Sequence, residues 1–385
     1  MEDSVLTLSG VPSPSDAPSI ATAGTATTRV DGIGLLGCGT VGASVARRLL
    51  ALHPQLVRAI AVRDPHKPRA VEWADFESDP FEVVDDPAVR VVVECIGGVG
   101  LARELVLRAI ARGKDVVTAN KDLIATEGPW LAAFAARTGA SLRYEAAVGG
   151  AIPIVRAMAG SLANEDVLEI GGVVNGTTNF ILDAMSDGAG YDEALAEAQR
   201  LGYAETDPRA DVDGHDAAHK LAILAGLAFH RPSVSGRIAR RGIGALTAED
   251  VRAGAERGWR LKLLAVARRV EEPPAAEGDR ALVVEAGVTP AYVPADHPFA
   301  RPRGAENVVR VVGAGCGELL FAGTGAGGDP TASAVVADVV AALESRERHV
   351  PAHAGPDLQT VPLRLPAFER VRDGVRSAIP VWAAA

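Results

Sequence analysis

The glycine-rich segment Gly37–Gly42 (GCGTVG) constrains the fold of this chain more than any other feature. It follows the short apolar run Ile33–Leu36 and precedes the amphipathic stretch Val41–Leu52. In a G-x-G-x-x-G turn between a strand and a helix, the glycines permit a tight turn, close approach of a pyrophosphate and close helix–strand packing. The segment therefore predicts a dinucleotide site. The residues that it assigns to the cofactor are Gly37, Gly39, Thr40, Val41 and Gly42.

Short apolar runs alternate with amphipathic stretches as far as residue 152. Strands are expected at Val57–Val62, Val89–Ile96, Val116–Ala119 and Leu142–Val148, and a helix at Leu101–Arg112. Such alternation is typical of a parallel sheet covered by helices on both faces. We therefore expect an α/β nucleotide-binding domain over residues 29–152, with a doubly wound parallel sheet of the Rossmann type.

The pattern changes after residue 153, where the apolar runs become longer and less regular. Strands are expected at Val167–Val174, Ala281–Val288, Val308–Val312 and Leu319–Phe321, and helices at Tyr191–Leu201, His215–Phe229 and Asp250–Val270. This pattern predicts a second, α+β domain over residues 153–328, with a mixed sheet. The apolar stretch Thr331–Leu343 predicts a helix within residues 329–350 that packs back towards the nucleotide domain.

The two ends of the chain differ in composition from its middle. Residues 1–28 are rich in Ser, Thr, Pro and Ala and lack the basic start and apolar centre of a signal peptide, so we expect a disordered leader. Residues 351–385 are rich in proline and weakly patterned, so we expect an irregular tail.

Charge and cysteine content exclude several classes of protein. The net charge is −10 and aromatic residues make up 4% of the chain, which argues against nucleic acid as a partner. No apolar run reaches the roughly 18 residues that a membrane span requires. Three cysteines cannot form a disulfide framework, so we expect a reducing, cytoplasmic location.

The residues that follow the second expected strand bear on the choice of cofactor. An acidic residue there binds the ribose 2′-hydroxyl of NAD, whereas an arginine accommodates the 2′-phosphate of NADP. Arg63 favours NADP, and Asp64 keeps NAD possible.

A second polar constellation lies between Gly202 and Lys220, where carboxylates crowd around the start of an apolar helix. Asp216 and Lys220 are four residues apart and therefore share one helix face. They could form an exposed ion pair, but the strongly apolar residues after Lys220 indicate a buried helix and favour a cleft. His215 and His219 have the spacing of a zinc site, yet the glutamate and cysteines that such sites use are absent nearby.

Residues 198–220 (AQRLGYAETDPRADVDGHDAAHK) resemble the signature of the homoserine dehydrogenase family. Further family-like segments occur in the expected order, and the resemblance covers residues 30–345. These segments are 37–42, 94–98 (ECIGG), 119–121 (ANK), 145–153 (EAAVGGAIP), 175–179 (NGTTN) and 323–333 (GTGAGGDPTAS).

The resemblance implies the NAD(P)-dependent interconversion of L-homoserine and L-aspartate 4-semialdehyde, a step of threonine and methionine biosynthesis. Lys220 would transfer the proton, and Lys121 would help to hold cofactor and substrate. Burial and a neighbouring lysine are expected to lower a lysine pKa there. The residues implied for the substrate are Glu205, Asp216, Asp211, Gly176 and Thr177. Those implied for the cofactor, besides the glycine turn and Arg63, are Gly97, Lys121, Gly202 and Gly327.

The same resemblance implies a monovalent cation, usually sodium, held by backbone carbonyls. The matching positions are Glu145, Val148, Gly150 and Ile152; without the resemblance they form only a glycine-rich hinge. It also implies a homodimer joined through the second sheet. About 60 residues would be needed for a regulatory ACT domain, and 35 follow Val350, so we expect none and expect threonine to leave the activity unchanged.

Two other functions fit part of the pattern. A different Rossmann-fold reductase of an amino-acid-like aldehyde, such as a semialdehyde dehydrogenase, would need a nucleophilic cysteine. Cys38, Cys95 and Cys316 lie in a glycine turn, a buried strand and another turn, which are poor settings for one. A non-catalytic protein that senses nucleotides could share the fold, but it would not need the carboxylates around Lys220.

Overall fold

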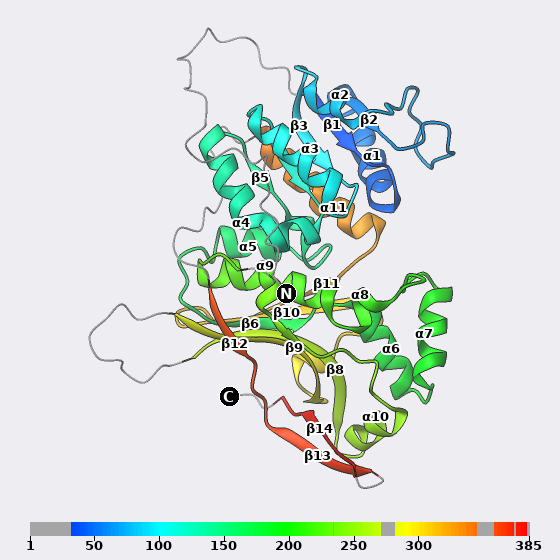
Figure 1. Ribbon diagram of the computed structural model, residues 1–385, viewed down its shortest axis with the longest axis vertical. Helices are drawn as coiled ribbons and strands as arrows, with labels where there is room; N and C mark the ends of the chain where they lie inside the picture. The colour runs from blue at the N-terminus through cyan, green and yellow to red at the C-terminus, as the bar shows by residue number, and fades with distance from the viewer. Residues whose placement is uncertain (1–31, 234, 271–281, 345–357, 373–374, 383–385) are drawn as a thin grey trace, which may run out of the picture. The chain divides into compact units, whose positions relative to one another are not determined.

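The computed structural model describes residues 32–233, 235–270, 282–344, 358–372 and 375–382, and the expected leader lies outside them. The described residues belong to one compact unit, Asp31–Ala385. Two sheets organise it (Figure 1).

The first sheet is parallel and has the strand order β2-β1-β3-β4-β5. Its strands are β1 (Gly32–Leu36), β2 (Val57–Ala61), β3 (Val89–Glu94), β4 (Asp115–Thr118) and β5 (Leu142–Arg143). Side chains alternate between its faces: Ile33 packs in one core with Val45 of α1 (Thr40–Leu52), whereas Leu36 packs in the other with Leu105 of α3 (Gly100–Ala111). Helices therefore cover both faces, as the sequence predicted.

The second sheet is mixed and has the order β11-β10-β6-β8-β9-β12, with β7 also paired to β9. Its strands are β6 (Val167–Val173), β7 (Ala239–Arg240), β8 (Trp259–Arg269), β9 (Val283–Pro294), β10 (Glu306–Gly313), β11 (Gly317–Thr324) and β12 (Gln359–Pro362). Helices α6 (Gly176–Ser186), α9 (His215–Phe229) and α10 (Ala248–Ala255) pack on one face, and a cluster that includes Phe299 and Trp382 packs on the other. The predicted fold class, a Rossmann-type sheet with a second α+β region, is confirmed.

The remaining helices begin and end as follows: α2 (Pro80–Asp85), α4 (Lys121–Thr138), α5 (Ile154–Ala159), α7 (Tyr191–Arg200), α8 (Arg209–Val212) and α11 (Gly328–Glu344). Figure 1 shows α11, in orange, among N-terminal elements, and its closest helical neighbour is α1. In the part of the chain that the structure describes, no helix is long and apolar enough to cross a membrane.

The helix expected at Asp250–Val270 is wrong. The helix ends at Ala255, and Trp259–Arg269 form β8 in the middle of the second sheet. Seven consecutive residues of this strand, Leu261–Ala267, are buried, so the alternation that marks a strand is lost. The strand expected at Leu142–Val148 is also too long, because Glu145–Ala147 form a 3-10 turn.

The prediction of an irregular tail over residues 351–385 is wrong for most of the described residues in that range. β12 pairs in parallel with β9, and β13 (Ala367–Arg372) forms a hairpin with β14 (Val375–Pro380). Proline is tolerated at the end of an edge strand such as β12, where its missing N–H breaks no ladder. The other residues of the tail, 351–357, 373–374 and 383–385, lie outside the described ones.

Candidate active site

Two lysines from different helices meet at one buried carboxylate. Lys220 Nζ lies 2.8 Å from Asp216 Oδ2 within α9, and Lys121 Nζ, at the start of α4, lies 3.0 Å from Asp216 Oδ1. The Asp216 side chain is 5% exposed. Lys220 Nζ also donates to the carbonyl of Val174 at 2.7 Å. The surface ion pair considered from the sequence is therefore not what the structure contains.

Asn175 connects these groups to a second carboxylate, and the sequence analysis missed it. Its Nδ2 donates to Asp211 Oδ1 at 2.6 Å and to Asp216 Oδ2 at 2.8 Å. Its Oδ1 accepts from Thr178 N at 2.8 Å and so caps α6. Its position directly before a helix is the sequence signal that could have identified Asn175 as a helix cap. The cap engages the N–H of Thr178, and the N–H groups of Gly176 and Thr177 make no hydrogen bond to the described residues.

The charges of the cluster control its protonation. Burial acts to raise the pKa of Asp216, but Lys220 and Lys121 outweigh burial and hold it well below its usual range. Asp216 in turn raises the pKa of Lys121. The expectation that burial and a neighbouring lysine lower the pKa is therefore wrong for Lys121, because the shared carboxylate dominates. Burial, followed by the charge of Asp216, raises the pKa of Asp211.

Glu205 is not brought into this hydrogen-bonded cluster. It lies between α7 and α8, where its side chain is exposed. The same loop is tied to the cluster through Tyr203, whose carbonyl accepts from Thr177 Oγ1 at 2.7 Å. Gly202 ends α7 with φ of +78°, which suits glycine, and is exposed.

The glycine turn has the geometry that the sequence predicted for it. Gly37 has φ of +91°, and a Cβ at Gly42 would lie 2.1 Å from the Gly37 carbonyl oxygen. Gly39 caps α1 without a side-chain hydrogen bond, and a Cβ there would meet nothing within 4 Å. The first and third glycines are thus required by the fold, whereas the space beside the second is open to a ligand.

A buried carboxylate shapes the neighbouring strand ends, and sequence reasoning missed it as well. Glu94 is fully buried at the end of β3, where Oε1 accepts from Ile96 N at 2.7 Å and from Gly97 N at 3.0 Å. Its Oε2 accepts from Thr118 Oγ1 at 2.6 Å. Asn120 donates to the Gly98 carbonyl at 2.6 Å and caps α4. This network holds the backbone at Gly97 beside the glycine turn, at the edge where such sheets bind nucleotides.

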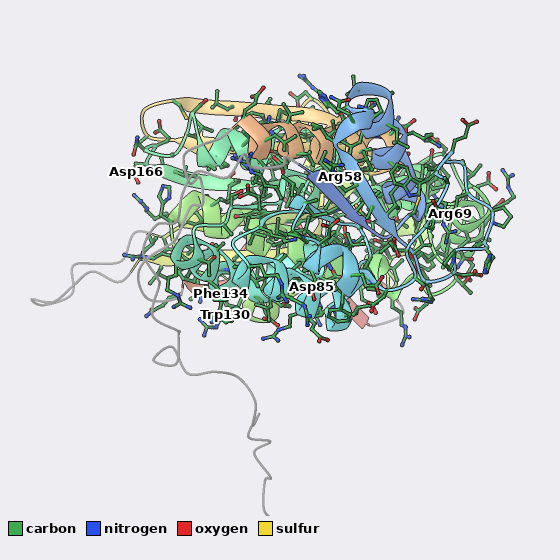
Figure 2. The ribbon with its side chains drawn as sticks, turned by 90° about the horizontal axis from the view of Figure 1, so that it is seen from above. Arg58, Arg69, Asp85, Trp130, Phe134 and Asp166 are labelled. Carbon is green, nitrogen blue, oxygen red and sulfur yellow. The ribbon has the colours of Figure 1, made fainter. Side chains whose placement is uncertain are left out.

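Beyond β2, the chain folds into a tight loop. Arg63 is exposed and its side chain makes no hydrogen bond or ion pair with the described residues, whereas the Asp64 carboxylate accepts from His66 N at 3.0 Å. Arg69, labelled in Figure 2, belongs to this loop. It donates to the carbonyls of Asp64 and Lys67 and lies 5.1 Å from the ring centroid of Phe76. The loop therefore leaves Arg63 unengaged.

The hinge residues lie where the two sheets are joined. Glu145 accepts through its carboxylate from Val155 N at 3.0 Å and Arg156 N at 2.7 Å, so it caps α5. Burial raises the pKa of Glu145 to about 7. Gly150 has φ of +57°, and a Cβ there would lie 2.7 Å from Gly325. Among the described residues, the Ile152 carbonyl accepts from Ile154 N, whereas those of Val148 and Gly150 accept no hydrogen bond.

Other candidate groups are not assembled for chemistry. Within the described ranges, no group of three or more His, Cys, Asp and Glu side chains could hold a metal ion, and these ranges offer His215 and His219 no third ligand of that kind. Burial raises the pKa values of the Cys38 and Cys95 thiols, which disfavours a thiolate nucleophile. Gly327, with φ of +122°, precedes α11, and its neighbour Gly328 approaches Ser44 and Thr40 of α1.

Comparison with known proteins agrees with this geometry. Residues 153–340 match the family profile described as homoserine dehydrogenase, and residues 37–145 match that described as the homoserine dehydrogenase NAD-binding domain. A homoserine dehydrogenase of Corynebacterium glutamicum is 45% identical over 326 residues, which are 82% of this chain and 72% of that protein.

Solved structures show the same likeness. A homoserine dehydrogenase from Thiobacillus denitrificans superposes with a TM-score of 0.78 at 39% identity, covering 89% of this chain and 84% of that one. A hyperthermophilic archaeal homoserine dehydrogenase in complex with NADPH has a TM-score of 0.68 at 26% identity, covering 83% and 99%. These matches confirm the resemblance seen in residues 198–220. The chain belongs to the homoserine dehydrogenase family of NAD(P)-dependent oxidoreductases.

Proposed function

We propose that the chain interconverts L-homoserine and L-aspartate 4-semialdehyde at the cluster around Asp216, with Lys220 transferring the proton. The observation that carries this proposal is the meeting of Lys121 and Lys220 at one buried carboxylate. A nicotinamide cofactor, when bound, supplies or accepts the hydride. Reduction of an aldehyde leaves a developing alkoxide, which requires a proton donor and positive charge beside it.

The two lysines differ in their contacts and therefore in their roles. Lys220 has two acceptors, Asp216 and the Val174 carbonyl, so one of its three N–H donors remains for the substrate oxygen. Lys121 is kept protonated by Asp216, which suits a fixed positive charge that stabilises the alkoxide rather than a group that gives up its proton. In the oxidative direction, neutral Lys220 accepts the proton of the homoserine hydroxyl.

The polar ends of the substrate need opposite partners. The carboxylate of Asp216 is already shared by two lysines and Asn175, so we assign the substrate ammonium mainly to Glu205 and Asp211, with Asp216 behind them. We assign the substrate carboxylate to the N–H groups of Gly176 and Thr177, because the start of an 11-residue helix attracts anions.

We assign the cofactor as NADP(H). Arg63 is free to meet a 2′-phosphate, whereas the Asp64 carboxylate is engaged by the turn at His66. The archaeal relative whose structure contains NADPH supports this choice. Gly37, Gly39 and Gly97 would approach the pyrophosphate and nicotinamide with their backbones, and Gly202 and Gly327 would border the site.

The hinge fits a sodium ion through backbone groups alone. The carboxylate of Glu145 is occupied by α5, which leaves the carbonyls of Glu145, Val148, Gly150 and Ile152 as the ligands we propose. Carbonyl oxygens suit hard cations, and the free carbonyls of Val148 and Gly150 favour such a site. Replacing sodium with a bulky organic cation at equal ionic strength should lower the activity.

We further propose a homodimer formed through β10 and β11. Ala322 pairs with Val308, which packs beside Trp382, so Leu320 lies on the same sheet face and is 43% exposed there. Phe299 and Trp382 already pack against part of that face, so a partner would cover less of it than the sequence implied. Sedimentation equilibrium should show a dimer, and Leu320→Glu should shift it towards the monomer.

We propose a cytoplasmic location for the protein. Support comes from its cysteines, since Cys38, Cys95 and Cys316 are all unpaired thiols. Free thiols of this kind persist in reducing compartments.

A spectrophotometric assay tests the central proposal. The purified protein should oxidise homoserine with NADP and less efficiently with NAD at alkaline pH, because the oxidation releases a proton. No oxidation with either cofactor would contradict the proposed activity. Oxidation that survives Lys220→Ala unchanged would contradict the assignment of Lys220 alone.

A further inference from the structure

Two polar contacts, side by side, join the first turn of α4 to α9. Lys121 Nζ lies 3.0 Å from Asp216 Oδ1, and the next residue of α4, Asp122, lies 2.8 Å through Oδ1 from His219 Nδ1. His219 directly precedes Lys220. Each lysine of the candidate site therefore has a chain neighbour in the second contact. His219 lies within residues 198–220 and Asp122 follows segment 119–121, but the resemblance assigned a role to neither.

The direction of the second hydrogen bond is fixed by charge. The hydrogen bond from His219 lowers the pKa of Asp122, and the ionised carboxylate can only accept. His219 Nδ1 must therefore carry the proton. The His219 side chain is 24% exposed and that of Asp122 41%, so the contact stands at the rim of the buried cluster rather than in free solvent.

The two contacts have opposite polarity, which fixes how α4 lies against α9. In the first, α4 supplies the donor and α9 the accepting carboxylate, and in the second the roles are reversed. A slip of α4 in one direction would bring the carboxylate of Asp122 towards that of Asp216, which is unfavourable. A slip in the other direction would bring Lys121 Nζ towards His219 Nδ1–H, so that two donors would face each other.

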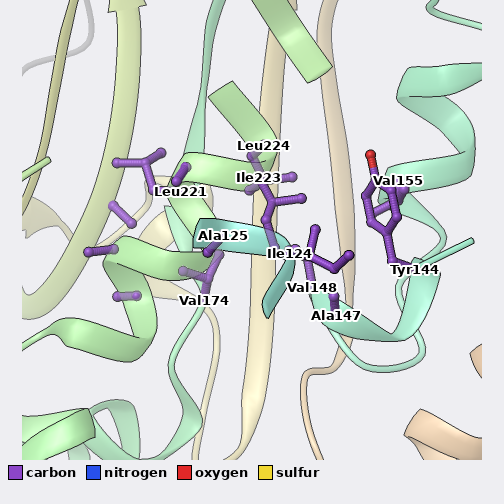
Figure 3. Close-up of a cluster of buried hydrophobic side chains, with 14 of the residues drawn as sticks. Ile124, Ala125, Tyr144, Ala147, Val148, Val155, Val174, Leu221, Ile223 and Leu224 are labelled. Carbon is purple, nitrogen blue, oxygen red and sulfur yellow. The ribbon is translucent and has the colours of Figure 1, made fainter. Parts of the chain in front are cut away.

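The apolar contacts between α4 and α9 specify the register of the two helices less precisely than the two polar contacts do. Ile124 of α4 packs there against Ile223 and Leu224 of α9, in the apolar cluster of Figure 3. The hydrophobic effect behind such packing is non-directional, so it does not by itself align particular polar atoms. The alignment of Lys121 with Asp216 therefore depends on the polar contacts.

We propose that Asp122 and His219 form a positioning pair that holds Lys121 against Asp216 during turnover. The inference rests on the proposed roles of Lys121 and Lys220. Neither member of the pair touches reacting atoms; both act through Lys121. Loosening the pair lets Lys121 swing away from the developing alkoxide, which slows the chemical step while leaving the glycine turn and its cofactor intact.

Single substitutions test the pair, with kcat, the KM for homoserine and the Kd of NADPH as readouts. Asp122→Asn and His219→Ala should each lower kcat about 1.5-fold to fivefold, the range of a partly exposed polar pair, without changing the NADPH Kd. The double variant should be no worse than either single one. His219→Gln keeps a side-chain donor and should recover part of the loss.

A second background separates a positioning role from a general effect on stability. In Lys121→Ala protein, adding Asp122→Asn should change kcat no further, because the pair has nothing left to position. Glu127→Gln is the matched control: it breaks an ion pair of 2.7 Å between α4 and Arg103 of α3 and should leave kcat unchanged. The proposed positioning role of Asp122 and His219 is refuted if Asp122→Asn keeps the wild-type kcat while Lys121→Ala lowers it. If Lys121→Ala also keeps it, the proposed role of Lys121 fails instead.

Discussion

Lys220 Nζ donates to the carbonyl oxygen of Val174, the residue that directly follows β6, at 2.7 Å. Asn307 Nδ2 of β10 donates to the same oxygen at 3.1 Å. The proposed proton donor is therefore fixed to the end of a central strand as well as to its own helix. A lysine held in this way has few rotamers to lose when substrate binds, which favours a precise proton transfer.

Lys220→Ala should lower kcat by about 10² to 10⁴, the usual contribution of a positioned general acid. NADPH should bind with its wild-type Kd, because the glycine turn is untouched. Single-turnover kinetics and a fluorescence titration of NADPH measure the two effects separately. A large loss of NADPH affinity at unchanged kcat would show that Lys220 serves the cofactor instead.

Asp216→Asn should destabilise the protein most at neutral pH, because it leaves two lysines without their counter-ion. Breaking such a buried pair costs about 3–5 kcal/mol. The pKa of Asp216 is lowered in the folded protein, so its contribution is present above the unfolded pKa of about 3.9 and is lost as pH falls. Urea unfolding should show that the difference in the free energy of unfolding between wild type and variant is smaller by about 1 kcal/mol near pH 3 than at neutral pH. A gap that widens in acid would exclude this account.

Sequence reasoning found those parts of the fold that have a local signature. The turn at Gly37, the helix that begins at His215 and the pair Asp216–Lys220 all follow from spacing within a few residues. Sequence reasoning missed β8 because the strand is buried on both faces, which removes the alternation of apolar and polar residues that marks a strand. The strands that pair with β8, β6 and β9, cannot be identified from the residues of β8 alone.

Long-range hydrogen bonds were the hardest part of the site to predict. Glu94 accepts a hydrogen bond from Thr118, and Asn175 donates one to Asp211. The role of each residue therefore depends on a partner that is distant in the chain. Lys121 was placed by family resemblance alone, and only the structure shows that it contacts Asp216. Its raised pKa follows from that contact and could not be derived from composition or spacing.

The three glycines of the turn should respond differently to alanine. At Gly42 the new methyl would overlap the Gly37 carbonyl oxygen at 2.1 Å, so Gly42→Ala should cost about 1–3 kcal/mol of folding stability. At Gly39 the methyl meets nothing within 4 Å, so Gly39→Ala should unfold almost like wild type but bind NADPH more weakly. Thermal unfolding and NADPH titration of both variants measure the difference in stability and in NADPH affinity. Equal losses of stability in the two variants would contradict this prediction.

Arg63→Ala should change the preference between cofactors without changing the chemistry. Arg63 is exposed and unengaged, so its removal leaves the loop held by Arg69 and by the turn at Asp64. Loss of a charged partner for the 2′-phosphate should raise the Kd of NADPH about tenfold and leave that of NADH unchanged. Lys67→Ala, in the same loop and equally exposed, serves as the matched control and should alter neither value. If Arg63→Ala weakened both cofactors equally, Arg63 would bind a group that they share, and Asp64 would become the residue that selects the ribose.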